Sequence, residues 1–370
     1  MRKKAQVKFL HNQPSNFYGT LRARVDNYFK SNGKSQHGNF AMGLKSAILL
    51  SAYVVPFIVY IAFVPGPGIS LLLWLLMGIA MAGVGMSVMH DANHGAYSAN
   101  PAINNIMGWA LNMVGGSIFN WKLQHNVLHH TYTNIEGMDE DIAAKAGLRF
   151  TEHSNLHARH KYQWLYAFPI YSITTLYWVV AKDFLQFRRY IRNGVIPAHK
   201  KGKGLILIRI LLAKLVYVFA FLVLPGLISN APFILTLSGF LLMHLTAGLI
   251  LTVTFQLAHS VEDTSHPIPD ANGIIENDWA IHQMNTTVNF CRKNKLISWY
   301  VGGLNFQVEH HLFPKISHIH YPRIAPIVKA TAEEFGVPYL EQPNLTKAIR
   351  SHIRYLKTLG RLPNPDTLLG

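Results

Sequence analysis

Residues 205–259 read LILIRILLAKLVYVFAFLVLPGLISNAPFILTLSGFLLMHLTAGLILTVTFQLAH, and this stretch decides the fold. It contains two apolar runs, 205–228 and 233–258, and each exceeds the roughly 20 helical residues needed to cross the hydrocarbon core of a bilayer. Between them, Ser229-Asn230-Ala231-Pro232 has the composition of a turn. We therefore predict a hairpin of two transmembrane helices.

The same pattern occurs earlier in the chain. Runs 46–64 and 69–88 are apolar and are joined by the turn-like Pro65-Gly66-Pro67-Gly68. Half of the 370 residues are hydrophobic and only 14% are charged, against about 25% in soluble domains. The predicted fold class is therefore an all-α integral membrane protein with four transmembrane helices in two hairpins. We expect a cytoplasmic N-terminal segment (1–45), a membrane domain (46–340) and a peripheral C-terminal tail (341–370).

Lysine and arginine orient these spans. Nine of them precede the first run, twelve lie in 89–204 and eleven follow residue 258, whereas neither turn contains any. By the positive-inside rule, both termini and the central stretch face the cytoplasm. This bias also accounts for the net charge of +16, so we expect no nucleic-acid partner. Arg209 and Lys214, inside the third run, are expected to snorkel toward the near surface.

Two further apolar stretches need a different explanation. Residues 106–119 are too few for a crossing, and residues 164–181 are followed by a run of basic residues. If either stretch crossed alone, the histidine motifs on its two sides would lie on opposite faces of the membrane. We expect both stretches to form interfacial or re-entrant helices.

Eight histidines have the spacing of metal ligands. They form His90-x3-His94, His125-x3-His129-His130 and His310-His311, with His259 at the end of the last apolar run. A helix brings residues i and i+4 onto one face, and imidazole is the commonest protein ligand of transition metals. A single tetrahedral ion takes four ligands, so two ions fit the supply better than one. Because the predicted topology returns every motif to the cytoplasmic side, we expect a cytoplasmic helical cap there that holds a di-metal site.

Other histidines have plainer explanations. His153, His157 and His160 also have ligand-like spacing, but their basic neighbours favour an interfacial or structural role. His244 lies mid-span, where a hydrogen bond between helices is favoured over a role in lining a substrate tunnel. For His282, a role in supporting the site and a solvated position in a loop both stay open.

Three of the motifs resemble the histidine boxes of integral-membrane fatty acid desaturases. They are His90-Asp91-Ala92-Asn93-His94, His125-Asn126-Val127-Leu128-His129-His130 and Gln307-Val308-Glu309-His310-His311. The resemblance runs from about residue 40 to 340 and includes Thr133-Asn134-x-x-Gly137-x-Asp139-x-Asp141 and Gly302-Gly303-Leu304-Asn305-Phe306. Gln307 stands where many of these enzymes have histidine. That replacement marks the front-end subgroup, whose members insert a double bond between an existing one and the carboxyl end.

The resemblance implies a centre of two iron ions with dioxygen as co-substrate. The positions that match its ligands are His90, His94, His125, His129, His130, His259, His310 and His311, with Gln307 as a ligand either directly or through a bound water. Such a centre removes two hydrogens from adjacent methylenes of a long acyl chain, leaving a cis double bond and water. Metal-bound histidines usually donate their other N–H to an acceptor. The acids expected to support them in this way are Asp91, Asp139, Asp141 and Glu309.

Electrons are expected to come from a separate protein. Many front-end relatives carry a fused b-type cytochrome domain with a His-Pro-Gly-Gly signature, and this sequence does not contain that tetrapeptide. The expected donor is a ferredoxin, or a b-type cytochrome with its reductase. The expected substrate is a long-chain fatty acyl group carried on coenzyme A or on a lipid. The expected location is a bacterial inner membrane.

Two kinds of alternative stay open. A lipid hydroxylase or acetylenase needs the same boxes, spans and electron supply, so only its product separates it from a desaturase. From a different class, a non-catalytic membrane protein that binds metal or haem would place ionisable residues or facing histidines along its spans. Here His244 alone among the candidate ligands lies in the middle of a span.

Overall fold

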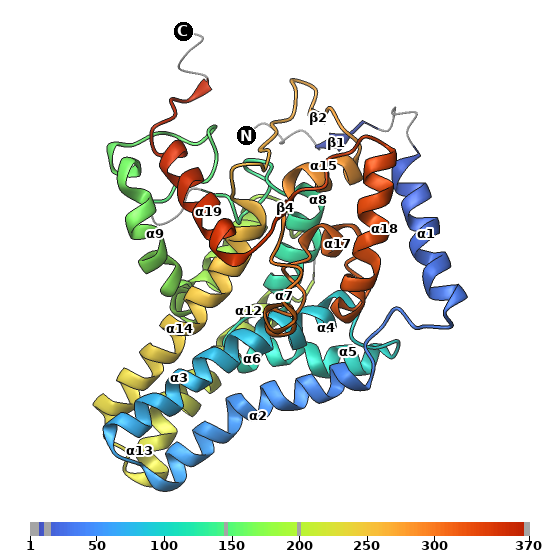
Figure 1. The fold of residues 1–370 in the computed structure, drawn as a ribbon. Helices are drawn as coiled ribbons and strands as arrows, with labels where there is room; N and C mark the ends of the chain where they lie inside the picture. Colours follow the sequence, from blue (N-terminus) through green and yellow to red (C-terminus); the bar gives the residue numbers. More distant parts are fainter. Residues whose placement is uncertain (1–6, 11–15, 144–146, 198–200, 366–370) are drawn as a thin grey trace. The chain divides into compact units, whose positions relative to one another are not determined.

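The computed structural model describes residues 7–10, 16–143, 147–197 and 201–365, and it is mainly helical (Figure 1). The chain divides into two compact units. We call Asn39–Leu123 with Phe168–Val253 the membrane unit. We call Met1–Gly38 with Gln124–Ala167 and Thr254–Gly370 the histidine unit.

Four helical segments are long and apolar enough to cross a membrane. They are α2 (Phe40–Phe63); Pro67–His94, made of α3 (Pro67–Gly83), η1 (Val84–Met89) and α4 (His90–His94); Lys203–Ser229, made of α12 (Lys203–Val218), η5 (Phe219–Val223) and α13 (Leu224–Ser229); and α14 (Phe233–His259). The four predicted apolar runs thus form helices of sufficient length, and their crossing of a membrane stays a prediction. The first begins at Phe40 rather than at residue 46, because the Asn39 side chain accepts a hydrogen bond from the Met42 amide at 3.3 Å and caps the helix there.

The turns between consecutive spans lie where the sequence predicts them. Val64 after α2 and Asn230 after α13 both adopt the left-handed region, with φ of 39° and 55°. Within the membrane unit, α2 packs against α3 and against α13. Large apolar side chains such as Ile58 of α2 and Leu212 of α12 stay exposed. Such a surface is suited to lipid rather than to water.

Lys214 shows that one prediction about the third span is wrong. Its buried ammonium forms an ion pair with Asp183 at 2.5 Å and donates to the backbone oxygens of Trp178, at 2.8 Å, and of Gly115. The Trp178 indole also donates to Asp183, at 3.0 Å. Because the ammonium has an anionic partner and two carbonyls inside the protein, Lys214 points inward rather than snorkelling. Arg209 has an exposed side chain, as predicted.

The two remaining apolar stretches form short or bent helices. The first lies in α5 (Pro101–Gly108), α6 (Ala110–Met113) and α7 (Ile118–Trp121), each too short to cross a bilayer alone. The second lies in η3 (Ala158–Tyr162), α9 (Gln163–Ser172), α10 (Thr174–Tyr177), η4 (Trp178–Lys182) and α11 (Asp183–Arg192), and this run bends by 55° at Ile173. Their interfacial or re-entrant position stays a prediction.

The histidine unit is built from short helices and two pairs of short strands. Its helices include α1 (Phe17–Ser31), most of η2 (Lys122–His129), α8 (His130–Tyr132), α15 (Trp279–Thr286), α16 (Lys295–Tyr300), α17 (Gln307–Leu312), η6 (His318–His320), α18 (Tyr321–Glu334) and α19 (Leu345–Leu359). Strand β1 (Lys8–Phe9) pairs in parallel with β2 (Ile274–Ile275), and β3 (Asn289–Phe290) pairs in parallel with β4 (Glu341–Gln342). Each pair joins segments that are distant in the sequence.

An apolar core supports one side of this unit. Helices α1 and α18 lie side by side (Figure 1). Leu21 of α1 and Ile324 of α18 are fully buried in their shared core, which also takes in Val308 and Leu312 of α17. Because α17 carries the third histidine motif, the burial of its apolar residues fixes the position of that motif.

Candidate metal centre

The second histidine motif lies in a π-helix, and the predicted helix face shared by His125 and His129 is confirmed. It occupies η2, and His130 begins α8. In an α-helix, residues five apart point about 140° away from each other. The i→i+5 hydrogen bonding of a π-helix instead brings them to one side. The rings of His125 and His130 therefore meet, with their Nε2 atoms 3.3 Å apart, and His129 stacks on His125.

A glycine turn leads into the third histidine motif. Gly302 and Gly303 have φ of 62° and 68°, a region that glycine adopts without strain. A Cβ atom on Gly303 would also lie 2.7 Å from Cβ of His318. After this turn, α17 begins at Gln307, so Gln307 and His311 share one helix face.

Three histidines converge from three different elements. They are His129 of η2, His259 at the end of α14 and His311 of α17, and all are buried. One ring nitrogen of each lies within 4.8 Å of the other two. Two ligands on opposite sides of an ion stand about 4 Å apart at a metal–nitrogen distance of about 2.1 Å. The three nitrogens therefore need to approach one another by only about 1 Å to bind one ion.

Each of these three rings is held by a hydrogen bond at its own Nδ1 atom. The Nδ1 atoms of His129, His259 and His311 donate to Asp139 Oδ2 at 3.0 Å, Thr286 O at 3.2 Å and Gln283 Oε1 at 2.7 Å, respectively. Donation from Nδ1 leaves each neutral ring with its lone pair on Nε2. That is the tautomer of a metal-binding histidine whose orientation is set by an outer hydrogen bond.

Gln307 completes this group. Its amide nitrogen lies 2.9 Å from His259 Nε2 and 3.5 Å from His311 Nε2. Two buried atoms of the group, His129 Nε2 and Gln307 Oε1, have no hydrogen-bond partner among the described residues. Such an atom costs about 1–3 kcal/mol. A transition-metal ion accepts imidazole nitrogen and amide oxygen as ligands and would satisfy both atoms, so the residues present fit a metal ion.

A second group of histidines lies beside the first in the same unit. His130 is 4.6 Å from His310 and 4.4 Å from His311 between ring centroids, and His125 stacks with His310 at 5.9 Å. Nδ1 of His310 lies 3.1 Å from the Tyr321 hydroxyl. The histidine unit thus brings together all its predicted histidine ligands, which are His125, His129, His130, His259, His310 and His311.

The first histidine motif lies in the membrane unit, at the end of its second candidate span. Its rings, from His90 and His94, lie 4.7 Å apart, and each is 5.7 Å from the Trp121 ring. A π-helical turn, η1, precedes them, and Gly95 with φ of 76° ends the helix directly after them. The i, i+4 spacing thus produces the adjacent rings that the sequence predicts.

Two of the predicted acids lie beside His129. Asp141 Oδ2 lies 3.5 Å from His129 Nδ1, which donates its shorter hydrogen bond to Asp139. The Gln124 amide donates to Asp141 Oδ1 at 2.6 Å. Burial raises the pKa of the Asp139 carboxyl, but His129 and the backbone amides of Asp141 and Asn134 outweigh burial and lower that pKa to about 2. Asp139 is therefore ionised, and it holds the His129 ring by a charged hydrogen bond.

The other two predicted acids have different surroundings. Glu309 accepts hydrogen bonds from Asn289 Nδ2 at 2.8 Å and from the Tyr339 hydroxyl at 2.7 Å. These bonds anchor α17 to β3 and to the segment before β4. Burial raises the pKa of the Glu309 carboxyl above its usual range. Asp91 is buried in α4 of the membrane unit, with Lys45 as a charged neighbour.

Helix α15 supplies support that the sequence shows only in part. His282 is buried, and its Nε2 lies 2.8 Å from the Thr133 carbonyl, so its position in a solvated loop is excluded. Gln283 and Thr286, one and four residues further on, hold His311 and His259 through the bonds described above. The Gln283 side-chain amide and the Thr286 backbone carbonyl belong to no sequence pattern that predicts contact with a histidine ring.

Asn134 is a further residue whose role only the structure shows. Its side chain donates to the His259 carbonyl at 3.0 Å, and its backbone amide donates to Asp139 Oδ2 at 3.0 Å. Its φ of 57° lies in the left-handed region, which asparagine tolerates better than most residues. It thus connects the end of α14 with the carboxylate that holds the His129 ring.

The histidines expected to be structural have structural contacts. His153 Nε2 lies 3.0 Å from the His266 carbonyl, and His160 Nδ1 accepts from the His157 amide at 3.1 Å. In the membrane unit, His244 Nε2 lies 3.0 Å from the Tyr217 hydroxyl of α12, which confirms the predicted bond between helices.

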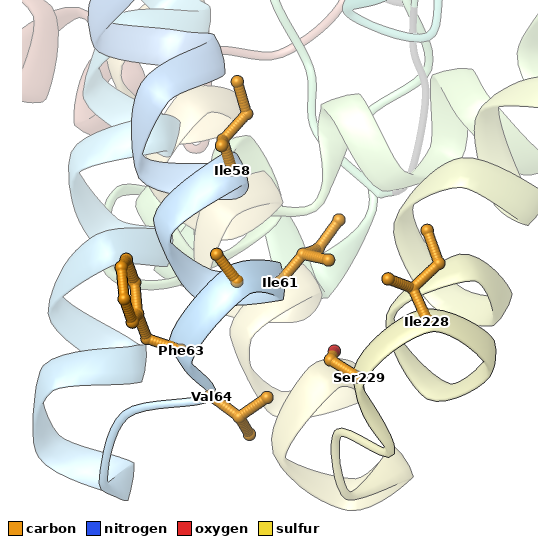
Figure 2. A pocket seen from close by; sticks show the side chains of 7 residues that line it. Ile58, Ile61, Phe63, Val64, Ile228 and Ser229 are labelled. Atoms are coloured by element: carbon orange, nitrogen blue, oxygen red, sulfur yellow. The ribbon is translucent and has the colours of Figure 1, made fainter.

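A hollow in the membrane unit lies far from the histidines of that unit. It has a volume of about 650 Å³ and is lined by Ile58, Ile61, Ala62, Phe63, Val64, Ile228 and Ser229, at the tips of α2 and α13 (Figure 2). The segment Pro67–His94 is about 40 Å long at 1.5 Å per residue. The hollow lies at the opposite end of this segment from His94, and six of its seven lining residues are apolar.

The sequence matches known proteins over most of its length. Residues 40–343 match the family described as fatty acid desaturase. The sn-1 linoleoyl-lipid 6-desaturase of Synechocystis sp. is 36% identical over 362 residues, which are 96% of this chain and 98% of that protein. The protein of the same name from Arthrospira platensis is 36% identical over 95% of this chain and 94% of its own length. The acyl-lipid (8-3)-desaturase of Physcomitrium patens is 36% identical over 97% of this chain and 74% of its own length.

Proposed function

The chain belongs to the fatty acid desaturase family and is a front-end desaturase; on that premise we propose its substrate, its metal and its electron supply. The proposed substrate is a lipid-bound acyl chain that already carries a double bond, and the new cis bond enters on its carboxyl side. The names of the relatives support a lipid carrier over coenzyme A, since they describe linoleoyl-lipid and acyl-lipid desaturases. Gln307 in the third motif supports the position of the new bond.

We propose that the centre holds two iron ions. The observation that carries this proposal is the group of His129, His259 and His311, each held at Nδ1 and each with one ring nitrogen within 4.8 Å of the other two. Gln307 joins this group, directly or through a water. His125, His130 and His310 serve as further ligands. His90 and His94 are assigned as ligands by their match to the first box of the family.

Iron bound at these residues supplies the activation of dioxygen. Each double bond releases two hydrogens from adjacent methylenes. Dioxygen takes up these two hydrogens together with two electrons from the donor and two protons, and it leaves as two waters. The protein's part is to hold the ligands rigidly and to exclude water, because an unactivated C–H bond reacts selectively only when it is held in place.

The electrons are proposed to come from a separate ferredoxin, or from a b-type cytochrome with its reductase. The proposed location is a bacterial inner membrane, with two helical hairpins and with both termini and a cytoplasmic cap carrying the metal centre on the cytoplasmic side. The distribution of lysine and arginine supports this orientation, because the turns at Pro65–Gly68 and Ser229–Pro232 contain neither residue. Alkaline phosphatase fused at either turn should be active, whereas a fusion at the C-terminus should be inactive.

The reaction is tested in a bacterial host that is fed linoleic acid and supplied with ferredoxin and its reductase. Gas chromatography of the fatty acids should show a triene with the new bond on the carboxyl side, and the His310→Ala variant should not form it. A hydroxylated product would instead show that the centre catalyses hydroxylation and not desaturation. Metal analysis of the purified protein should find near two irons per chain, and a protein without iron would refute the proposed centre.

The carrier of the acyl chain is tested with purified protein in lipid nanodiscs. Linoleoyl groups are offered either in a glycerolipid of the nanodisc or as linoleoyl-coenzyme A, with the same donor and reductase. The glycerolipid should be converted and the coenzyme A ester should not. The reverse result would contradict the lipid carrier while leaving the desaturase assignment intact.

A further inference from the structure

The C-terminal helix α19 separates basic from apolar residues. Its basic residues, together with Arg361 two positions after its end, recur three or four positions apart; the set is Lys347, Arg350, Arg354, Lys357 and Arg361. At 100° per residue this spacing keeps all of them within an arc of about 80°. We call these five residues the basic stripe. Helix α19 contains no aspartate or glutamate, so the stripe is not neutralised from within its own helix.

The opposite face of α19 is buried in the histidine unit. Ala348, His352, Leu356 and Leu359 are all buried, whereas Lys347, Arg350, Arg354 and Arg361 are exposed. No large apolar side chain within α19 is exposed. A helix that binds a bilayer presents an apolar face to it. The exposed face of α19 lacks one and therefore suits a negatively charged soluble protein better than a membrane.

Several buried polar contacts fix α19 in place. Arg149 is fully buried and donates to the carbonyl oxygens of Leu359 and Leu362, each at 2.6 Å. The Tyr355 hydroxyl donates to the Phe150 carbonyl at 2.6 Å, and Gln163 Nε2 donates to the Leu356 carbonyl at 2.8 Å. The stripe is therefore a preorganised surface, which lowers the entropy cost of binding a partner.

The same helix contacts the segment that carries a proposed iron ligand. His352 Nδ1 donates to the Ser260 carbonyl at 2.6 Å, and Ser260 directly follows His259. The Glu262 amide donates to Ser351 Oγ at 3.2 Å, and Arg354 pairs with the Glu262 carboxylate at 3.4 Å. An α-helix with its side chains is about 10 Å across. A molecule bound to the stripe is therefore separated from this segment by little more than the thickness of one helix.

We propose that the basic stripe is the docking surface for the electron donor, an acidic one-electron carrier. The proposal rests on the proposed function and adds to it the surface and the chemistry of the partner. Each docked carrier gives up one electron and is itself oxidised, so two successive encounters supply the two electrons that one double bond requires. Helix α19 brings the carrier next to His259 through the contact of His352 with Ser260. Opposite charges raise the rate of encounter and select the carrier.

The test is a binding measurement, which does not depend on turnover. Full-length protein in neutral nanodiscs is titrated with a plant-type [2Fe–2S] ferredoxin and, separately, with a soluble b-type cytochrome domain. The stripe variant is Lys347→Glu with Arg350→Glu. The matched control is Lys293→Glu with Lys295→Glu, which makes the same charge change at exposed residues of the same unit. Circular dichroism and the thermal unfolding midpoint establish that both variants are folded.

The stripe variant is expected to weaken binding of at least one carrier by about tenfold or more at low ionic strength, and the control by less than twofold. High salt should remove most of the difference. Equal effects of the two variants, or no binding of either carrier to the unsubstituted protein, would overturn the proposal. The proposal would also be overturned if the stripe variant still bound the carrier but no longer bound phosphatidylglycerol vesicles. The stripe would then bind lipid headgroups.

The product assay in the fed bacterial host tests the proposed function separately, and its readout is independent of this titration. A triene formed by the unsubstituted protein together with equal carrier binding by both variants would refute only the docking surface. A missing triene, together with stripe-dependent carrier binding, would refute only the proposed reaction.

Discussion

The membrane unit and the histidine unit both bury histidine, but they use its two nitrogens differently. In the membrane unit, His244 contacts the Tyr217 hydroxyl at 3.0 Å through Nε2 and Thr175 Oγ1 at 3.1 Å through Nδ1. In the histidine unit, His259 is held at Nδ1 by a carbonyl, and its Nε2 is turned toward His311, His129 and Gln307. Both side chains are almost fully buried, so burial does not distinguish them.

The comparison separates a structural histidine from a candidate ligand. His244 has hydroxyl partners at both of its ring nitrogens. His259 has a carbonyl partner at Nδ1, and its Nε2 lies 2.9 Å from Gln307, another candidate ligand. The same contrast holds for charge. Lys214 and Asp183 of the membrane unit satisfy each other, whereas the ionised Asp139 of the histidine unit holds a ring that points elsewhere.

The largest effect is expected when a ligand of the histidine unit is removed. His259→Ala should lower the iron content of the purified protein to one ion per chain or fewer and reduce the triene below detection, because one of three converging nitrogens is lost. Mass spectrometry of the metal and gas chromatography of the product measure both. Full iron content in this variant would contradict the distinction between His259 and His244.

The next effect tests the buried charges of the membrane unit. Lys214→Met leaves Asp183 buried without its cation, and we expect a loss of about 3–5 kcal/mol in unfolding free energy. The double variant Lys214→Met/Asp183→Asn should recover most of that loss, since no charge is left buried. Unfolding midpoints in detergent compare the two. If Lys214→Met were as stable as the double variant, the Asp183 carboxylate would not depend on Lys214 for its charge compensation.

A smaller effect is expected at the residue that holds a ligand ring. Asp139→Asn keeps the size of the side chain but removes the charged acceptor of His129 Nδ1. The affinity for iron should fall by about 10–100-fold, as for other outer partners of metal-bound histidines. Competition with a chelator measures it. Asp141→Asn, at a longer distance from the same ring, serves as the control and should have the weaker effect.

The smallest effect is expected at the structural histidine of the membrane unit. His244→Gln keeps one amide group near Tyr217 or Thr175 and loses the other contact, so the unfolding free energy should fall by about 1 kcal/mol. The iron content should stay at the level of the unsubstituted protein. A loss of iron in this variant would remove the contrast between the two units.

The parts of the fold that depend on local composition were predictable. The four spans follow from apolar runs of sufficient length, and the joints at Val64 and Asn230 follow from turn residues. The histidine motifs were visible because ligand spacing repeats along the chain. One local prediction was wrong, the snorkelling of Lys214, because that side chain pairs with Asp183, which lies 31 positions away in the sequence (214 − 183). The π-helical form of residues 122–129 was not predicted, since it depends on how the chain packs around His125.

By itself the sequence determined that this is a helical membrane protein and which histidines are candidate ligands, since both follow from the chemistry of short segments. Only the tertiary structure showed which of the candidates converge and which groups hold their rings. Asn134, Gln283 and Thr286 contact the metal centre through an amide or a backbone carbonyl, groups that occur throughout every chain. Their role arises because η2, α14, α15 and α17 meet at one place, and that meeting depends on the packing of segments that are distant in the sequence.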